Sequence, residues 1–323
     1  MYRWTDYYKE ARAVYEKENG KPKQALDLYD LTMRVHDPDN KKSSDILEFS
    51  DDYSALIASL SERVNEALKD ENLYEKQAMA YGIKDPLQFE EELKPLGDLF
   101  VPQLEEKVFG SYAHVDNVKI YRSFVTQEQA KSSWLWHFDN NTKEQIKILI
   151  YLTDVNDGDG QYEFLFNKAT REGLTVPTSR SNWDDWVFTG NAKFDLNPNA
   201  NISWGGTDRV PLPVVDHCLK NGYGRAKILG NRGKALLFDN NIIHRGTPAR
   251  KKCRDVVTFQ FKPSLEKIRP TVERSTTGNG WQHTTFNVDP STIEPLETCD
   301  ANGHRAHLRE HFQKIQREET GRT

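Results

Sequence analysis

The residues best suited to chemistry are His137 and Asp139, separated by one residue, and the distant His244. In an extended segment, side chains two positions apart point to the same side, so His137 and Asp139 can bind one ion while Phe138 faces away. His244 follows a short apolar run and can complete the set if its strand lies beside the first. Two imidazoles and one carboxylate occupy one face of an octahedral ion and leave the other face open. This spacing predicts a catalytic metal centre of the non-haem Fe(II) type, because structural sites close all their positions.

Arg254 is a candidate for binding a carboxylate next to this metal. It lies ten residues after His244, at the head of an alternating segment over 255–262 that we expect to be a strand. A guanidinium can hold a carboxylate through two parallel hydrogen bonds. Arg250 is a competitor, but it lies in a Lys/Arg-rich turn, where a solvated charge cluster is the ordinary explanation. We therefore favour Arg254.

The elements that must position these residues change in character along the chain. Residues 1–110 read as mainly helical, with apolar side chains at helical spacing over 53–68. Further helices are expected over 87–93 and over 99–108, the second closed by Gly110.

From 111 to 265 the pattern favours strands separated by turns. The expected strands lie over 118–124, 133–137, 146–155, 162–166, 235–238, 242–244 and 255–262. No glycine-rich phosphate loop opens a helix, which disfavours a nucleotide-binding α/β fold. Many short strands predict a mainly β fold with flanking helices (α+β), built on a barrel or jelly roll.

A long insert over 167–230 interrupts the predicted β region. It is rich in Gly, Asn, Asp and Pro and carries Trp183, Trp186 and Trp204. Long loops within a compact domain are usually functional or disordered. The tryptophans either line a substrate pocket or anchor the loop.

The remaining residues, 266–323, form an expected C-terminal extension with a charged helix over 303–318. His304, His307 and His311 share one face of that helix, but the charges around them make a solvated helix the simpler interpretation than a metal site. We expect the whole chain, 1–323, to be a single domain.

Composition excludes several classes of function. The chain has 323 residues and a formal net charge of −5, and no Lys/Arg-rich run stands out beyond the short turn at Arg250, so we expect no nucleic-acid partner. The apolar runs are too short to span a bilayer, and the N-terminus lacks an apolar signal region. Cys218, Cys253 and Cys299 form no paired spacing. A cytoplasmic location is therefore expected.

These motifs resemble the Fe(II)- and 2-oxoglutarate-dependent dioxygenases, in particular the phytanoyl-CoA dioxygenase-like branch. The similarity covers roughly residues 95–165 and 230–265. It rests on Trp136-His137-Phe138-Asp139, Lys147 to Val155, Gly233 to Asp239, His244-Arg245-Gly246, Arg254, and a helix followed by a strand over 104–124.

The resemblance implies that Fe(II) is bound by His137, Asp139 and His244, and that Arg254 pairs with the distal carboxylate of 2-oxoglutarate. It implies a double-stranded β-helix, a cupin-like jelly roll, with helices packed outside. The reaction of this family consumes 2-oxoglutarate and O2, releases succinate and CO2, and usually hydroxylates an unactivated C–H bond.

The leading hypothesis is a hydroxylase that acts on a small-molecule metabolite. The sequence departs from the branch after Phe166, where the usual Pro-Gly-Ser-His segment is replaced, so the substrate contacts must differ. The presence of Asp139 disfavours a halogenase. Two alternatives stay open: a protein side-chain hydroxylase or demethylase with the same triad, and a non-oxidative cupin-type metal isomerase or binding module, which would not need Arg254. Nothing in the sequence indicates an oligomeric state.

Overall fold

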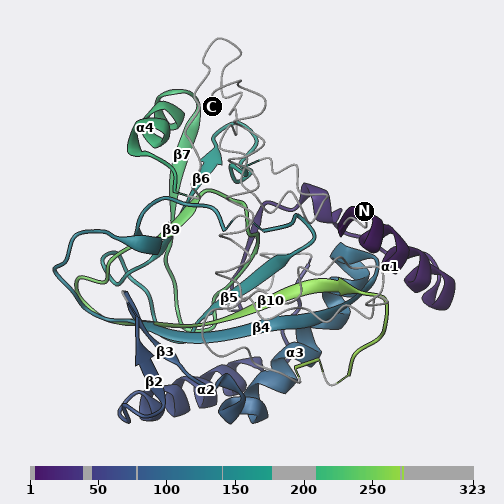
Figure 1. Ribbon diagram of the computed structural model, residues 1–323, viewed down its shortest axis with the longest axis horizontal. Helices are drawn as coiled ribbons and strands as arrows, with labels where there is room; N and C mark the ends of the chain where they lie inside the picture. The colour runs from purple at the N-terminus through teal and green to yellow at the C-terminus, as the bar shows by residue number, and fades with distance from the viewer. Residues whose placement is uncertain are drawn as a thin grey trace, which may run out of the picture.

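The structure is a computed structural model that describes residues 4–38, 46–77, 79–139, 141–176, 209–269 and 271–272. Two antiparallel sheets face each other in it (Figure 1). The long sheet has the order β1-β8-β5-β10-β4-β3-β2 and the short sheet the order β7-β6-β9. The strands are β1 (Met33–His36), β2 (Tyr74–Lys76), β3 (Ala80–Ile83), β4 (Tyr112–Ser123), β5 (Ile146–Tyr151), β6 (Tyr162–Asn167), β7 (Tyr223–Ile228), β8 (Ala235–Asp239), β9 (His244–Gly246) and β10 (Arg254–Ser264).

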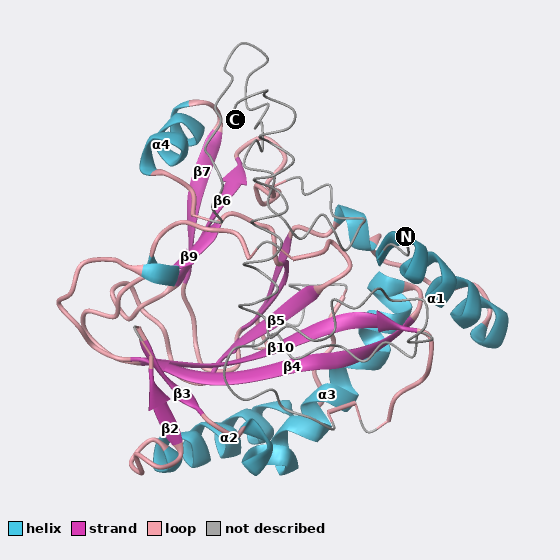
Figure 2. Ribbon diagram, viewed as in Figure 1, coloured by secondary structure: helices cyan, strands magenta, loops and turns pink. Residues whose placement is uncertain are grey.

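Helices cover the face of the long sheet that points away from the short sheet (Figure 2). The helices of the described residues are α1 (Trp4–Asn19), α2 (Tyr53–Ala67), α3 (Glu90–Leu104) and α4 (Leu212–Lys220). Helices α2 and α3 lie against the long sheet, whereas α4 lies beside the short sheet (Figure 1). The predicted mainly β fold, a double-stranded β-helix with helices outside it, is confirmed.

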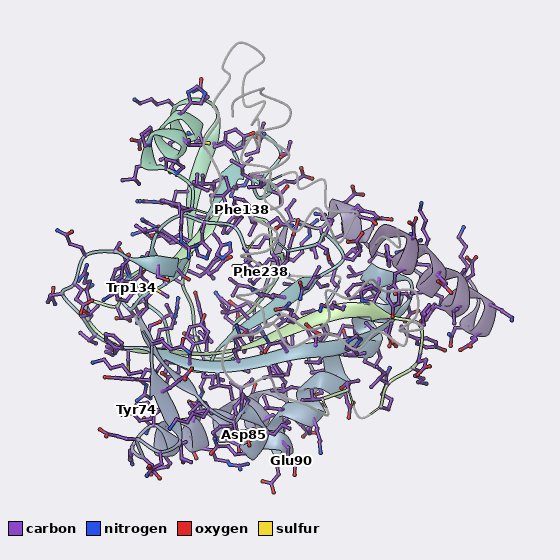
Figure 3. The ribbon with its side chains drawn as sticks, in the orientation of Figure 1. Tyr74, Asp85, Glu90, Trp134, Phe138 and Phe238 are labelled. Atoms are coloured by element: carbon purple, nitrogen blue, oxygen red, sulfur yellow. The ribbon has the colours of Figure 1, made fainter. Side chains whose placement is uncertain are left out.

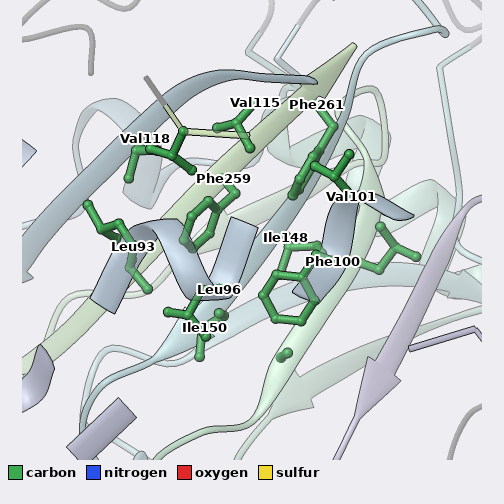
Figure 4. Close-up of a cluster of buried hydrophobic side chains, with 14 of the residues drawn as sticks. Leu93, Leu96, Phe100, Val101, Val115, Val118, Ile148, Ile150, Phe259 and Phe261 are labelled. Atoms are coloured by element: carbon green, nitrogen blue, oxygen red, sulfur yellow. The ribbon is translucent and has the colours of Figure 1, made fainter. Parts of the chain in front are cut away.

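Alternation along the central strands gives the long sheet two different faces. Ile148 and Ile150 of β5 and Phe259 of β10 pack in one buried cluster with Leu96 and Phe100 of α3 (Figure 4). The intervening residues of β5 point to the other side, toward the short sheet, because side chains alternate along a strand. Figure 3 shows Asp85 and Glu90 on the helical side and Phe138 and Phe238 on the opposite side. The space between the sheets is therefore where functional side chains can meet.

The prediction of two separate helices over 87–93 and 99–108 is wrong. One helix, α3, runs through Pro95 and Pro102. A proline within a helix costs about 3 kcal/mol, but the apolar face of α3 is continuous and fully buried, so packing outweighs that cost. Its buried side chains include Leu93, Leu96, Phe100, Val101 and Leu104. A single π-helical turn, Glu105–Phe109, follows and ends at Gly110 with φ 61°, the expected stop.

Most of the other differences between the predicted and the observed elements are short strands. β1, β2 and β3 lie within residues 1–110, which were expected to be mainly helical. β1 pairs with β8, and β3 pairs with β4. The strand expected over 133–137 is instead a 3-10 turn, Ser132–Trp134, followed by an isolated bridge at His137. Strands of three or four residues carry too little alternation to be recognised by their pattern.

The described part of the 167–230 insert is structured. It contains α4 and β7, and β7 completes the short sheet by pairing with β6. Residues 177–208, with Trp183, Trp186 and Trp204, lie outside the described residues, as does the helix expected over 303–318. Within the described residues, no helix is both long enough and apolar enough to cross a membrane.

Because His36 is buried, we expect the protein to lose stability in acid. His36 is fully buried, and burial lowers its pKa from 6.5 to about 4. Between these two values the unfolded chain binds a proton that the folded chain does not, so the free energy of unfolding falls as pH falls through this window. The effect reaches about 3 kcal/mol at most. Urea unfolding at pH 7 and pH 4.5 measures it: His36→Phe should lose less stability than wild type, and an equal loss in both proteins would contradict the prediction.

Candidate metal centre

The structure brings the three predicted metal ligands together between the sheets. His137 and His244 pair through their backbones, with N···O distances of 2.9 and 2.8 Å, and their ring centroids lie 4.2 Å apart. Asp139 Oδ1 lies 3.7 Å from His137 Nε2 and 3.8 Å from His244 Nε2. The three possible ligand atoms all lie within 4.8 Å of one another. One ion can contact all three after a small movement of the side chains.

Both histidines are oriented in the same way. Nδ1 of His137 lies 2.8 Å from the carbonyl oxygen of Leu135, and Nδ1 of His244 lies 2.8 Å from that of Ile242. A carbonyl oxygen can only accept, so each Nδ1 carries the proton and each Nε2 presents its lone pair. The Nε2 atoms are the ones that face the third ligand, which is the tautomer that metal binding requires.

The electrostatics keep the imidazoles neutral and the carboxylate charged. Burial lowers the pKa of His137 to about 3, with a further contribution from His244, against the opposing effect of Asp139. Burial also lowers the pKa of His244. Burial alone would raise the pKa of Asp139, but Lys147 and the two histidines outweigh it and hold that pKa well below its usual range. The site therefore needs to lose no proton at neutral pH before it binds a cation.

Lys147 is the close cationic partner of Asp139. It lies on β5, and its Nζ donates to Asp139 Oδ2, which leaves Oδ1 directed toward the histidines. The structure directs Lys147 inward, with its side chain 21% exposed.

A pair of asparagines holds the loop that carries Asp139. The backbone N–H of Asp139 donates to the carbonyl of Asn240 at 2.8 Å. The Asn241 side chain accepts from the backbone of Asn141 at 3.0 Å and donates back to its carbonyl at 2.8 Å. The Asn240 side chain donates to the carbonyl of Gln145 at 2.7 Å. The sequence predicted a turn at these asparagines but not their role in supporting the ligand loop.

Arg254 is buried at the start of β10, with 3% of its surface exposed. Its Nη1 donates to the carbonyl of Gly160, and its Nη2 donates to Ser123 Oγ at 3.1 Å. Its Nε has no hydrogen-bond partner, and Arg254 forms no ion pair within the described part of the chain. A buried cation without an acidic partner is costly, which makes this position suited to an anion.

Tyr162 is a site residue that sequence reasoning missed. Its ring stacks on His244, with centroids 5.1 Å apart, and its buried hydroxyl lacks a hydrogen-bond partner among the described residues. Burial raises the pKa of Tyr162, Asp139 raises it further, and Arg254 opposes this. The hydroxyl therefore lies within electrostatic reach of both the metal ligands and Arg254. The sequence did indicate that Tyr162 begins a strand. It could not indicate which face of the sheet Tyr162 occupies, because that depends on the pairing of β6 with β9.

Arg245 and Arg250, which adjoin His244 and Arg254 in the sequence, have structural partners. Arg250 donates to the carbonyls of Thr126 and Glu128, at 2.6 and 2.8 Å, and so ties two loops together. Arg245 donates twice to Glu163, at 2.9 and 2.8 Å, and its guanidinium lies 4.6 Å above the ring of Trp136. Arg245 therefore supports the wall of the site through Glu163 and Trp136.

A pocket of about 310 Å³ adjoins the segment that carries His137. Its walls are mainly apolar and include two arginines. The lining residues are Leu135, Trp136, Arg209, Val210, Pro211, Leu212 and Arg245.

Comparison with known proteins finds no family model and no curated protein that matches the chain. Among solved structures, the chain is similar to the non-heme alpha ketoglutarate dependent epimerase SnoN from nogalamycin biosynthesis, with a TM-score of 0.45 and 11% identity over 80% of this chain and 83% of that one. HygX from Streptomyces hygroscopicus, with nickel and 2-oxoglutarate bound, has a TM-score of 0.43 and 13% identity over 73% and 85%. EctD from S. alaskensis, with 2-oxoglutarate and 5-hydroxyectoine, has a TM-score of 0.43 and 11% identity over 73% and 74%. At these identities and TM-scores, the likeness does not assign a reaction to this chain.

Proposed function

We propose that the protein is an Fe(II)- and 2-oxoglutarate-dependent oxygenase that hydroxylates an unactivated C–H bond of a small molecule. Succinate and CO2 would be the co-products. One observation carries the proposal: a His-Asp-His group oriented for a cation occurs together with Arg254, a buried guanidinium that has no acidic partner within the described residues.

The donor set fits a divalent cation. His137 and His244 offer neutral nitrogens through Nε2, and Asp139 offers one ionised oxygen. Three protein ligands on one face are typical of oxygen-activating iron sites, since they leave positions for co-substrate and O2. Fe(II), when bound, supplies the activation of O2 that these side chains lack.

Arg254 and Tyr162 support the binding of 2-oxoglutarate. A carboxylate against Arg254 can accept from Nε, and Ser123 already fixes the other side of the guanidinium at Nη2. The unpartnered hydroxyl of Tyr162 is a second donor, within electrostatic reach of Arg254. Burial strengthens such charge-assisted hydrogen bonds. A non-oxidative binding module would have no use for this anion position.

The pocket described above supports the proposal of a small-molecule substrate. The pocket beside Trp136 is lined mainly by apolar side chains of the described residues, which is typical of small-ligand sites. Asp139 as the third ligand supports hydroxylation over halogenation.

An anaerobic titration tests the proposal. Adding Fe(II) and then 2-oxoglutarate should produce a visible metal-to-ligand charge-transfer band that neither produces alone. Succinate in place of 2-oxoglutarate is the matched control and should produce no band, since it lacks the keto group that chelates the metal. The proposal fails if wild-type protein shows no band with 2-oxoglutarate.

A further inference from the structure

Lys147 lies on a central strand of the long sheet, with its backbone paired on both sides. Strand β5 pairs with β8 and with β10, which places Lys147 opposite Phe238 and Gln260. Its chain neighbours, Ile146 and Ile148, belong to the buried cluster on the helical side of the sheet. Because side chains alternate along a strand, Lys147 points to the other side, toward the candidate metal centre.

An apolar residue would be the ordinary choice at this position. The next residues on the same face of β5, Leu149 and Tyr151, are buried and pack in an apolar cluster. A cation in such a setting is costly unless it has an acidic partner, and apolar side chains are often at least as stabilising as a buried ion pair. Asp139 is that partner, since its Oδ2 accepts from Lys147 Nζ. Fold stability alone therefore does not explain Lys147.

The two oxygens of the Asp139 carboxylate have different partners. Oδ2 binds Lys147, whereas Oδ1 lies 3.7 Å from His137 Nε2 and 3.8 Å from His244 Nε2. The backbone of Asp139 is held by its bond to the carbonyl of Asn240. An ion placed among the three ligands therefore meets Oδ1, while Lys147 occupies the oxygen that could otherwise bind beside it.

The number of carboxylate oxygens that bind a metal decides how many coordination positions stay open. An octahedral ion that takes one atom from each of three protein ligands keeps three positions open. A chelating 2-oxoglutarate fills two of these and leaves one for O2. A second oxygen from Asp139 would fill that last position.

We propose that Lys147 is a positioning residue that keeps Asp139 a ligand through one oxygen and so preserves the position that O2 needs. This inference rests on the proposed function, because a reaction of 2-oxoglutarate with O2 needs all three open positions. A residue that merely orients Asp139 would strengthen metal binding. Lys147 is instead a cation beside a cation site, and like charges oppose such binding. Its role is to favour an open position over metal affinity.

Nitric oxide tests the open position, because it binds ferrous iron where O2 would bind and gives a characteristic electron paramagnetic resonance signal. The full-length protein is loaded anaerobically with Fe(II) and saturating 2-oxoglutarate and is then titrated with nitric oxide. Lys147→Met should need at least about 10-fold more nitric oxide than wild type for half of the signal, an effect typical of losing a group bonded to a metal ligand. Lys147→Arg, which can also donate to Oδ2, should recover most of the signal, and Lys147→Gln, a neutral donor, should lie between the two.

Calorimetric titration with Co(II) separates this role from an orienting one. Lys147→Met should bind Co(II) within a few-fold of wild type or more tightly, whereas loss of a group that only orients a ligand weakens binding about 10- to 100-fold. Lys234→Met is the matched control. Lys234 pairs with Asp37 at 3.0 Å, and its side chain is only 14% exposed. It directly precedes β8, at the end opposite Asn240, so this variant should behave as wild type in both titrations.

Three results would overturn the inference. The first is an equal nitric oxide signal in wild type and Lys147→Met, and the second is a Co(II) affinity that falls at least about 10-fold in Lys147→Met. The third is a rise of about 10-fold or more in the 2-oxoglutarate concentration that half-saturates the charge-transfer band of this variant, which would assign Lys147 to the co-substrate. Absence of the band in wild type would reject the proposed function itself, so the two failures are distinguishable.

Discussion

The His137→Ala variant is expected to lose both metal binding and turnover. Changes to groups that merely orient a metal ligand weaken affinity or activity about 10- to 100-fold, so removal of a ligand should exceed about 100-fold. The backbone pairing between His137 and His244 does not depend on the imidazole. The fold should therefore persist while the site becomes incomplete.

Calorimetric titration with Co(II) under anaerobic conditions measures the affinity of this variant, and succinate formation measures its turnover. His114→Ala is the matched control, because His114 lies on β4 and forms no part of the His-Asp-His group. It should bind Co(II) as wild type does. If His137→Ala retained wild-type affinity with a normal melting curve, the assignment of His137 as a ligand would be rejected.

The Arg254→Ala variant is expected to keep the metal but to lose 2-oxoglutarate. Truncating one partner of a buried, hydrogen-bonded charge pair costs about 2–5 kcal/mol, which corresponds to a loss of affinity of about 30-fold to several thousand-fold. Co(II) binding should stay within a few-fold of wild type, since none of the three ligands changes. The 2-oxoglutarate dependence of the charge-transfer band measures the loss directly.

Arg250→Ala is the matched control, since Arg250 was the rival for the same role and its guanidinium is bound to loop carbonyls. It should bind 2-oxoglutarate as wild type does, with at most a small loss of stability. The reverse pattern, with 2-oxoglutarate binding lost in Arg250→Ala and retained in Arg254→Ala, would transfer the role to Arg250. Arg254→Lys should recover only part of the affinity, because an ammonium lacks the planar fork of donors.

The positions recognised in the sequence were those with strong local signals. His137 and Asp139 share a face because they are two residues apart, and His244 and Arg254 each adjoin a segment with clear strand character. The long strands β4 and β10 were expected over 118–124 and 255–262 and are observed as Tyr112–Ser123 and Arg254–Ser264. Such segments alternate for long enough to identify their period.

The positions that were missed depend on pairing between distant segments. Tyr162 reaches the site because β6 pairs with β9, and Arg209 does so because it forms a bridge with His137. Neither contact leaves a local pattern in the sequence. The prolines of α3 led to the wrong prediction of two helices for a related reason. The packing that offsets their cost comes from the distant strands β4, β5 and β10.

The backbone bridge between His137 and His244 makes the geometry of the candidate metal centre independent of the number of residues between the two histidines. Two reciprocal N–H···O=C bonds align His137 with His244. The distance between the two imidazoles therefore does not depend on the residues that connect them. Those residues include Arg209, Val210, Pro211 and Leu212, which line part of the apolar pocket. Residues can therefore be added, lost or exchanged between the two histidines while the reciprocal backbone bonds keep the two imidazoles aligned.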